Sequence, residues 1–256
     1  MVQPLAVLIY QAGLQVQPGP ESAEMMILAL DTSSKYCSMA LLQDSAVLAS
    51  TSGIREEPYA SRVFSDLRQI LRSTGAQLEQ IELFAVARGP GSFTGLRVGL
   101  AAVKGWAEVW SRPIAAVSVL EAIAAQARES APLVVAVVDA RGGQVFGGVY
   151  RRDRSGSRLT LQGEESIAPQ SEMLDIISQQ CGGETPVFVT TTGDAVRGAF
   201  SASVYAHAEL SEVSAELAPL IGQLGLEQSR RGELVDALQL EANYVRRSDA
   251  EVKWRG

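Results

Sequence analysis

Histidine is almost absent from this sequence, since His207 is the only one in 256 residues. A metal site built on two or three imidazoles therefore has no ligands to draw on, and a His-Glu-x-x-His helix is excluded. A Ser-His-Asp triad would need His207 as its base, and this residue stands in no recognisable constellation. We expect His207 to be an ordinary surface or partly buried side chain, and the scarcity of histidine excludes a typical zinc enzyme.

Cysteine and long apolar runs are also scarce. The two cysteines, Cys37 and Cys181, lie far apart without zinc-ligand or redox spacing, so we expect reduced, buried side chains. No apolar run reaches the roughly 18 to 20 residues that a membrane span needs. The stretch Pro4–Tyr10 lacks the basic flank and cleavage site of a signal peptide. These absences predict a cytoplasmic protein without a membrane contact.

Positive charge is in deficit, with 22 Lys and Arg against 29 Asp and Glu and a net charge of −7. A broad basic surface is therefore excluded, and direct capture of nucleic acid would depend on a local patch or on a complex. The hydrophobic content of 46% excludes a disordered chain and supplies enough apolar surface for one large domain or two lobes.

Strand patterns repeat along the chain, and in each half the first of three ends at an aspartate, Asp31 or Asp139. The patterns are Ile27–Leu30, Cys37–Leu42 and Ala46–Thr51 in the first half, and Leu133–Val138, Gln144–Tyr150 and 158–163 in the second. Laying Asp31 on Asp139 superimposes the strands that follow them. This self-similarity predicts two related lobes, each opening with three strands and continuing with alternating helices and strands.

Helical spacing and capping signals fill the intervals between the strands. They predict helices at Pro58–Thr74, Gly95–Trp110, Ser118–Arg128, Ser171–Cys181 and Val213–Arg231, the last interrupted or kinked at Pro219. We expect the domain organisation 1–24 as an N-terminal extension, 25–129 as the first lobe, 130–240 as the second lobe and 241–256 as a tail. Met25-Met26 is a hypothetical physiological start, because strand patterning begins abruptly there.

The loop Gly89–Gly95 joins a strand to a helix, where backbone amides and the helix dipole hold anions in other proteins. It lacks the Lys-[Ser/Thr] ending of a Walker loop, so the residues alone favour a tight turn and close helix packing. Asp31 and Asp139 stand where a two-lobed nucleotide-binding protein places metal-water ligands, and turn stabilisation is the alternative. Possible anion or nucleotide contacts are Asp31, Thr32, Gly91, Ser92, Thr94, Gly95 and Asp139.

The helix predicted at Gly95–Trp110 is apolar on two sides. Its first stripe is Leu96, Leu100, Val103, Ala107 and Trp110, and its second is Val98, Ala102, Gly105 and Val109. One stripe suffices to face a core, so the second must be covered by more of this chain or by another chain.

Four stretches carry a resemblance to a known family. They are Ile27-Leu28-Ala29-Leu30-Asp31-Thr32, the run Gly89–Arg97, Asp139-Ala140-Arg141 and Tyr244-Val245-Arg246. The chain resembles the TsaB (YeaZ) family over about 26–247, and the run Gly89–Arg97 is highly specific for that family and its paralogue TsaD. The sequence departs from the family pattern in its extension and at Asn243, where a proline is common.

The resemblance implies an α/β fold of the two-lobed actin-like or Hsp70-like (ASKHA, ribonuclease-H-like) type, with duplicated mixed sheets flanked by helices. It also implies a noncatalytic dimerisation and scaffold subunit in the complex that forms N6-threonylcarbamoyladenosine in tRNAs reading ANN codons. TsaD would transfer the threonylcarbamoyl group, and TsaE would be the associated ATPase. No cofactor is expected on this chain, whereas ATP and a metal ion are expected on partner subunits.

The resemblance further implies pairing with a TsaD-like paralogue, a homodimer when the chain is alone, and contact with tRNA only through the complex. The implied interface uses the first two helices and consists of Tyr59, Val63, Leu67, Ile70, Val98, Ala102, Gly105 and Val109. The alternative is an enzyme acting alone, either a nucleotide-dependent phosphotransferase that uses Asp31 and Asp139 or a glycoprotease-like peptidase. A weaker third alternative is an anion-binding module at Gly89–Gly95.

Overall fold

The structure, a computed structural model, describes residues 8–9, 24–54, 57–154, 156, 158–201 and 203–245. Most of the expected extension, residues 1–7 and 10–23, and residues 246–256 of the expected tail lie outside the described residues. Two compact units are formed. Unit 1 comprises the described residues of Met1–Arg88, Ser92–Val117 and Glu216–Ala242, and unit 2 those of Gly89–Gly91, Ser118–Ala215 and Asn243–Gly256.

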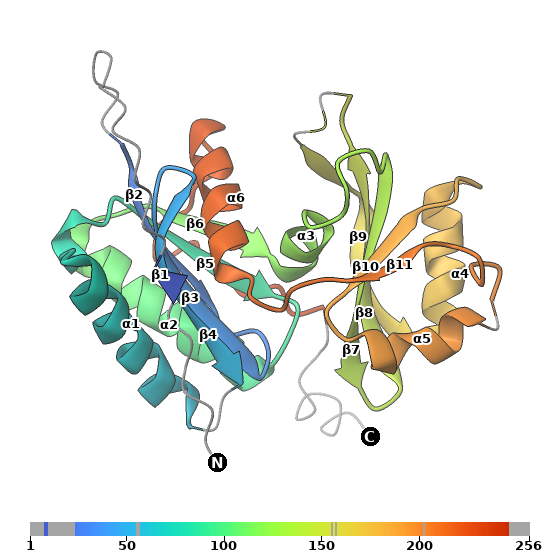
Figure 1. Ribbon diagram of the computed structural model, residues 1–256, viewed down its shortest axis with the longest axis horizontal. Coiled ribbons are helices and arrows are strands. Elements are labelled where there is room, and N and C mark those ends of the chain that lie inside the picture. Colours follow the sequence, from blue (N-terminus) through green and yellow to red (C-terminus); the bar gives the residue numbers. More distant parts are fainter. Residues whose placement is uncertain are drawn as a thin grey trace. The chain divides into compact units, whose positions relative to one another are not determined.

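Unit 1 is built on a six-stranded mixed sheet in the order β1-β4-β3-β2-β5-β6 (Figure 1). Its strands are β1 (Leu8–Ile9), β2 (Met26–Asp31), β3 (Tyr36–Gln43), β4 (Ala46–Ile54), β5 (Leu83–Gly89) and β6 (Ile114–Ser118). Strands β2, β3 and β4 form an antiparallel meander, and β5 runs parallel to β2. The register places Asp31 opposite Ser38. Because β2 and β5 are central and covered on both faces, both are near-continuous apolar runs.

Two helices cover one face of this sheet, α1 (Tyr59–Thr74) and α2 (Phe93–Trp110), which lie side by side in Figure 1. Helix α1 ends at Gly75, whose φ of 74° is the left-handed value that favours glycine. Helix α2 begins two residues earlier than predicted, because the Ser92 hydroxyl accepts the Gly95 amide hydrogen and caps the first turn. A short 3₁₀ turn (Leu78–Gln80) connects α1 to β5.

Helix α6 (Ala218–Arg230) packs against β2 and β3 of the same sheet and lies on the opposite face from α1 and α2 (Figure 1). Close approach requires glycine, because a Cβ added at Gly222 would lie 2.4 Å from the Leu42 side chain. The prediction of a long helix over Val213–Arg231, interrupted or kinked at Pro219, was wrong, because the helix begins only at Ala218. Pro219 stands in the first turn and starts the helix, where its missing N–H costs nothing.

Unit 2 repeats the same plan on a five-stranded sheet in the order β11-β10-β7-β8-β9. Its strands are β7 (Leu133–Arg141), β8 (Gln144–Arg152), β9 (Leu159–Pro169), β10 (Val187–Thr190) and β11 (Leu210–Glu212), and its helices are α3 (Val119–Ala124), α4 (Gln170–Cys181) and α5 (Gly193–Ser201). Strands β7, β8 and β9 form the antiparallel meander, and β10 runs parallel to β7. The duplication predicted from Asp31 and Asp139 is therefore confirmed at the level of strand pairing.

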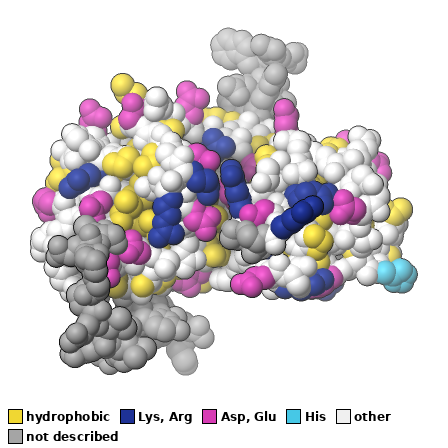
Figure 2. Space-filling model, turned by 90° about the horizontal axis from the view of Figure 1, so that it is seen from above, with side chains coloured by type: hydrophobic (Ala, Val, Ile, Leu, Met, Phe, Trp, Pro, Cys, Tyr) yellow, Lys and Arg dark blue, Asp and Glu magenta, His cyan; other side chains and the backbone are white. Residues whose placement is uncertain are grey.

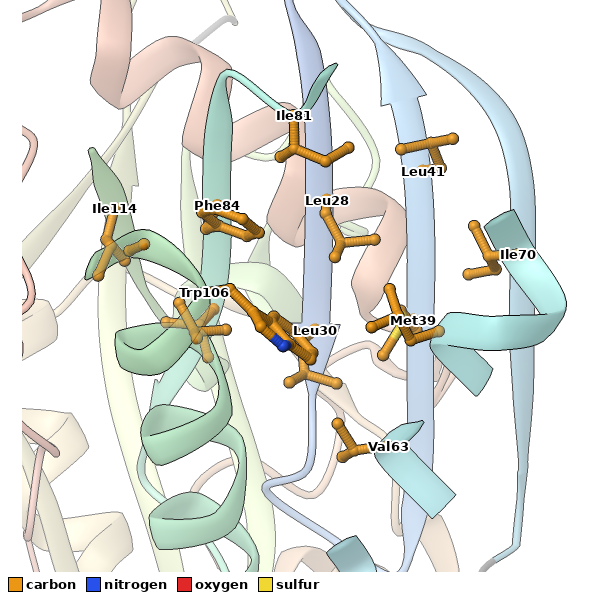
Figure 3. Close-up of a cluster of buried hydrophobic side chains, with 14 of the residues drawn as sticks. Leu28, Leu30, Met39, Leu41, Val63, Ile70, Ile81, Phe84, Trp106 and Ile114 are labelled. Atoms are coloured by element: carbon orange, nitrogen blue, oxygen red, sulfur yellow. The ribbon is translucent and has the colours of Figure 1, made fainter. Parts of the chain in front are cut away.

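The larger core joins α1 and α2 to the sheet of unit 1. Figure 3 shows Val63 and Ile70 of α1 and Trp106 of α2 among sheet side chains such as Met39 and Phe84. A second core in unit 2 packs α4 against β7 and β8. Both cysteines are buried and neither forms a disulfide, as expected from their separation in the sequence.

The two units differ from the continuous ranges expected for the lobes, 25–129 and 130–240. The chain leaves unit 1 after Val117, before α3, because α3 packs on β7, β8 and β9. It returns at Glu216, because the apolar side of α6 covers β2 and β3. A boundary predicted from the sequence divides the chain into continuous segments, whereas a compact unit contains all segments that are buried against one another. None of the described helices is long and apolar enough to cross a membrane.

Candidate functional site

The end of β2 meets the start of α2 in a closely packed polar junction. The Ser92 amide donates to the Ser33 carbonyl at 2.6 Å, and the Thr32 hydroxyl donates to the Gly95 carbonyl at 2.8 Å. The Tyr59 hydroxyl lies 3.1 Å from the Ser92 hydroxyl and also reaches the Ser34 carbonyl at 3.2 Å. These groups of the predicted anion site therefore bind one another.

Two glycines allow this contact between α2 and the β2 turn. A Cβ at Gly95 would lie 2.0 Å from the Thr32 carbonyl oxygen, and one at Gly99 would lie 2.2 Å from the Thr32 hydroxyl. No side chain fits at Gly95 without moving the backbone of the turn, and a side chain at Gly99 would displace the Thr32 side chain. The interpretation of these glycines as close-packing residues therefore has a direct structural basis.

Asp31 is the most strongly perturbed carboxyl group of the junction. Its side chain is 1% exposed, and its Oδ1 accepts the Ser33 amide hydrogen at 2.8 Å. Its Oδ2 is buried and has no hydrogen-bond partner in the described part of the chain. Burial raises the pKa of Asp31 from 3.8 to about 6, against the smaller opposing effect of the Ser33 hydrogen bonds. Close to neutral pH this group can hold or release a proton.

Asp139 occupies the equivalent position in unit 2. Its Oδ1 accepts the Arg141 amide hydrogen at 2.9 Å, which is the same two-residue turn that Asp31 makes with Ser33. Its own amide donates to the Thr192 hydroxyl at 3.0 Å, and Thr192 adjoins Thr190 at the end of β10. Unlike Asp31, its side chain is exposed.

The predicted anion contacts are thus divided between the units. Asp31, Thr32, Ser92 and Gly95 come together in unit 1, where they are committed to the junction, and Thr94 is exposed in the first turn of α2. Gly91 and Asp139 belong to unit 2.

The four α1 residues expected at an interface lie inside unit 1, which corrects that prediction. Tyr59, Val63, Leu67 and Ile70 are at most 8% exposed, and Val63, Leu67 and Ile70 belong to the large core. They form the single apolar stripe by which α1 binds the sheet, so they cannot also bind a partner.

The second stripe of α2 lies at the surface of unit 1. Gly105 and Val109 are exposed, with Val109 at 71%, and Val98 and Ala102 are half-buried. The first stripe is buried against the sheet, apart from half-buried Trp110. The part of the predicted interface that lies on α2 is therefore accessible.

The exposed side of α1 adds residues that the sequence interpretation had assigned to no site. Phe64 is 55% exposed, and its ring meets Trp106 edge-on at a centroid distance of 6.5 Å, which joins α1 to α2. Arg68 and Arg72 follow Phe64 at intervals of four residues, so all three share one row. A four-residue count from buried Val63 leads to buried Leu67, whereas the same count from Phe64 leads to Arg68 and Arg72. This count in the sequence would have separated the buried side of α1 from its exposed side. We call the exposed side of the two helices the α1–α2 face.

A buried ion pair lies on the inner side of α1. The Arg62 Nε atom is 2.6 Å from the Asp66 Oδ2 atom, with side-chain exposures of 9% and 3%. Burial raises the pKa of Asp66, although Arg62 opposes this effect. The Arg62 Nη2 atom is buried without a partner among the described residues, so the pair is incompletely satisfied.

Unit 2 contains one further polar cluster, centred on Glu165. Its carboxylate accepts hydrogen bonds from Ser118, from the Tyr150 hydroxyl at 2.6 Å and from the Asn243 amide at 2.6 Å. Burial and then the neighbouring Glu165 charge raise the pKa of Tyr150 well above 10. Ser118 and Asn243 are two of the three residues at which the chain passes into unit 2, and Glu165 binds both of them. The sequence interpretation missed this role, because the three donors are far apart in the chain.

His207 is exposed, and Figure 2 shows the imidazole at the surface. Within the described ranges, no group of three or more His, Cys, Asp and Glu side chains is arranged to hold a metal ion.

Two mixed sheets, each with an antiparallel meander followed by a parallel strand and both flanked by helices, define the actin-like (ASKHA) class. The model of the family TsaD, tRNA N6-adenosine threonylcarbamoyltransferase, matches residues 54–213. The tRNA threonylcarbamoyladenosine biosynthesis protein TsaB of Escherichia coli (strain K12) is 37% identical over 163 residues, which cover 62% of this chain and 69% of that protein. The chain belongs to the TsaB family of tRNA threonylcarbamoyladenosine biosynthesis proteins.

Other relatives match over more of the chain. TsaB of Bacillus subtilis (strain 168) is 29% identical over 230 residues, covering 90% of this chain and 98% of that protein. A crystal structure of a Pseudomonas aeruginosa protein with similarity to peptidase YeaZ is 30% identical with a TM-score of 0.72, and covers 87% of this chain and all of the other. A structure of YeaZ from Pseudomonas aeruginosa, at 29% identity, has the same TM-score.

Proposed function

We propose that this chain is a noncatalytic pairing subunit in the formation of threonylcarbamoyladenosine in tRNA. It binds a TsaD-like paralogue through the α1–α2 face and supports transfer of the threonylcarbamoyl group by that paralogue. The adenosine acceptor lies in tRNAs reading ANN codons. A TsaE-like ATPase binds the resulting complex, tRNA is contacted through the complex, and the work takes place in the cytoplasm. Alone, the chain self-associates through the same face.

One observation carries this proposal, the apolar and small residues at the surface of two adjacent helices. Phe64 and Val109 are 55% and 71% exposed, and between them α2 presents Ala102 and Gly105. An added Cβ at Gly105 would meet nothing within 4 Å, so a partner helix can approach the backbone closely there. Removing such a surface from water contributes about 25 cal/mol per Å².

The noncatalytic role is supported by the hydrogen bonds that the polar groups of unit 1 form with one another. Thr32, Ser92 and Tyr59 are bound to one another or to nearby carbonyls, and Gly95 brings the helix backbone against the turn. A phosphate group would have to break these contacts to enter. A phosphotransferase using Asp31, or a peptidase, is therefore the less supported alternative.

Reconstitution with the TsaD-like paralogue and the TsaE-like ATPase of the same organism tests the proposal. Gly105→Arg should abolish comigration with the paralogue and reduce tRNA modification to the level without this chain, because the arginine occupies the space of the partner helix. The unfolding temperature should not fall, since the position is open and arginine favours a helix more than glycine does. Multi-angle light scattering and analysis of modified nucleosides provide the readouts.

Gly198→Arg in α5 is the matched control, since an added Cβ there also meets nothing within 4 Å. It should pair and support modification normally. Full pairing by Gly105→Arg would refute the assigned surface. Sustained ATP turnover or peptide cleavage by the isolated chain, lost on Asp31→Ala or Asp139→Ala, would favour the enzyme instead.

A further inference from the structure

Charge on the α1–α2 face is strongly biased in sign. Its ionisable side chains that are exposed or half-buried are Arg68, Arg72, Arg97, Lys104 and Glu108. Four positive and one negative charge give the face +3, and the whole chain carries −7, so the remaining residues carry −10. The α1–α2 face is thus a local basic exception on an acidic protein.

The two α1 arginines are the most distinctive part of this bias. Arg68 and Arg72 are exposed and stand one helical turn apart, where like charges repel. Within the described ranges, no hydrogen bond or ion pair joins either guanidinium to an acidic group. They border a surface hollow lined by Ser65, Gln69 and Ser73 as well. No acidic group in the described part of unit 1 pairs with these charges.

The charges lie beside the apolar surface that the proposed pairing covers. Arg68 follows Phe64 in the same row of α1, and Arg97 stacks on the Phe93 ring at 3.8 Å. A partner that covers Phe64 and Val109 therefore brings its own rim against these cations. Rim charges of opposite sign steer association and select partners, whereas like charges exclude them.

Self-pairing about a two-fold axis would place this face against the same face of a second copy. A net charge of +3 on one copy would then face a net charge of +3 on the other, and the two would repel each other. Resting on the proposed function, we infer that the α1–α2 face selects a partner protein whose apolar helical surface is bordered by carboxylates, and that it binds a second copy of this chain less tightly than it binds that partner. The basic rim around Arg68 and Arg72 thus ranks the paralogue above self-association.

A protein surface fits this face better than an RNA backbone does. Phosphates would need cations throughout the contact, but the centre consists of Phe64, Val109, Ala102 and Gly105. Such residues are typical of the core of a protein interface surrounded by a polar rim.

Charge reversal on the full-length chain tests the inference. Arg68→Glu/Arg72→Glu should weaken pairing with the TsaD-like paralogue by at least about tenfold in Kd. Mixed with the unaltered chain, the variant should form a pair of copies at least about tenfold tighter than either alone, because opposite charges now face each other. Raising NaCl should weaken the heterotypic pair and strengthen pairing of unaltered copies. Analytical ultracentrifugation gives all three constants.

Arg154→Glu/Arg230→Glu is the matched control, since it changes the net charge equally at exposed positions outside the α1–α2 face. It should leave pairing with the paralogue and with the other copy unchanged, and circular dichroism should confirm the fold of both variants. Equal affinities for the paralogue before and after reversal at Arg68 and Arg72, or unaltered copies that pair more weakly in high salt, would overturn the inference.

Unmodified tRNA is included as a separate probe in a filter-binding assay. Binding by the isolated chain that Arg68→Glu/Arg72→Glu removes would overturn the inference in favour of an RNA surface. Loss of pairing by Gly105→Arg together with no effect of charge reversal would reject only the charge selection. Retained pairing by Gly105→Arg would reject the proposed function itself.

Discussion

Phe64 and Trp106 meet edge to face across α1 and α2, at 6.5 Å between ring centroids and 83° between ring planes. Trp106 is 8% exposed and anchored on Phe84 of the sheet, whereas Phe64 is 55% exposed. The contact therefore connects the buried core to the surface through two rings. It makes one continuous apolar surface of two helices that otherwise bind the sheet separately.

Phe64→Ala should lower the unfolding free energy by only about 1 kcal/mol, because it removes one edge-to-face contact from a half-exposed ring. It should weaken pairing with the TsaD-like paralogue more than it weakens the fold. Calorimetric titration and thermal unfolding measure the two effects. Leu161→Ala, in β9 of unit 2 and 37% exposed, is the control and should leave pairing unchanged.

Two glycines of α2 should respond in opposite directions to alanine. Gly95→Ala should destabilise the protein by about 3 kcal/mol or more, because its Cβ would lie 2.0 Å from the Thr32 carbonyl oxygen. Gly105→Ala should stabilise it by about 0.5–1 kcal/mol, because the site is open and alanine favours the helix. Urea unfolding measures both, and equal effects would contradict the packing described for the junction.

Asp31 should make stability depend on pH. Burial raises the pKa of Asp31 from 3.8 to about 6, so the native state keeps this proton to a higher pH than the unfolded state does. The stability that the protonated carboxyl group contributes is therefore fully present below about pH 4. That contribution is lost as the pH rises through about 6. The unfolding free energy of the unaltered chain should therefore fall relative to Asp31→Asn by about 3 kcal/mol between about pH 4 and pH 7. Urea midpoints across this range measure it.

Asp139→Asn is the natural comparison for this pH series, since the same turn is made there by an exposed carboxylate. An identical pH dependence in both variants would show that burial of Asp31 is not its source.

The buried pair Arg62–Asp66 should show strong coupling in a double-mutant cycle. Arg62→Met should cost about 3–5 kcal/mol, since it leaves the Asp66 carboxylate buried without its cation. Arg62→Met/Asp66→Leu should recover most of that loss, because it replaces both buried charges by apolar side chains. It also removes the Arg62 Nη2 atom, which is buried and has no partner among the described residues. Additive losses would mean that the two side chains contribute independently.

Local patterns in the sequence identified most elements of the fold correctly. The strand meanders after Met26 and Leu133 and the helix that ends at Gly75 all rest on short-range spacing and turn chemistry. Helix α6 was misjudged because Pro219 reads equally well as a kink or as a first-turn residue. Only burial against Leu42 decides between the two, and that contact is long-range.

The predicted interface was half misplaced for a related reason. In α2 two apolar stripes were visible, so the surplus stripe with Val109 could be recognised. In α1 one stripe was assigned to a partner although the sheet needs it, and buried Val63 and Ile70 demonstrate this use. The basic row of Arg68 and Arg72 carries no apolar signal, so periodicity alone could not reveal it.

Helix α6 covers a sheet whose strands were all translated long before it. Until Ala218–Arg230 leaves the ribosome, the side of β2 and β3 that receives Gly222 has no cover, and Leu42 faces water or a chaperone. Unit 1 therefore reaches its final form only after the segment Ser118–Ala215 of unit 2 has been translated. Any truncation before Glu216 should yield an aggregating product, even though it retains the whole α1–α2 face.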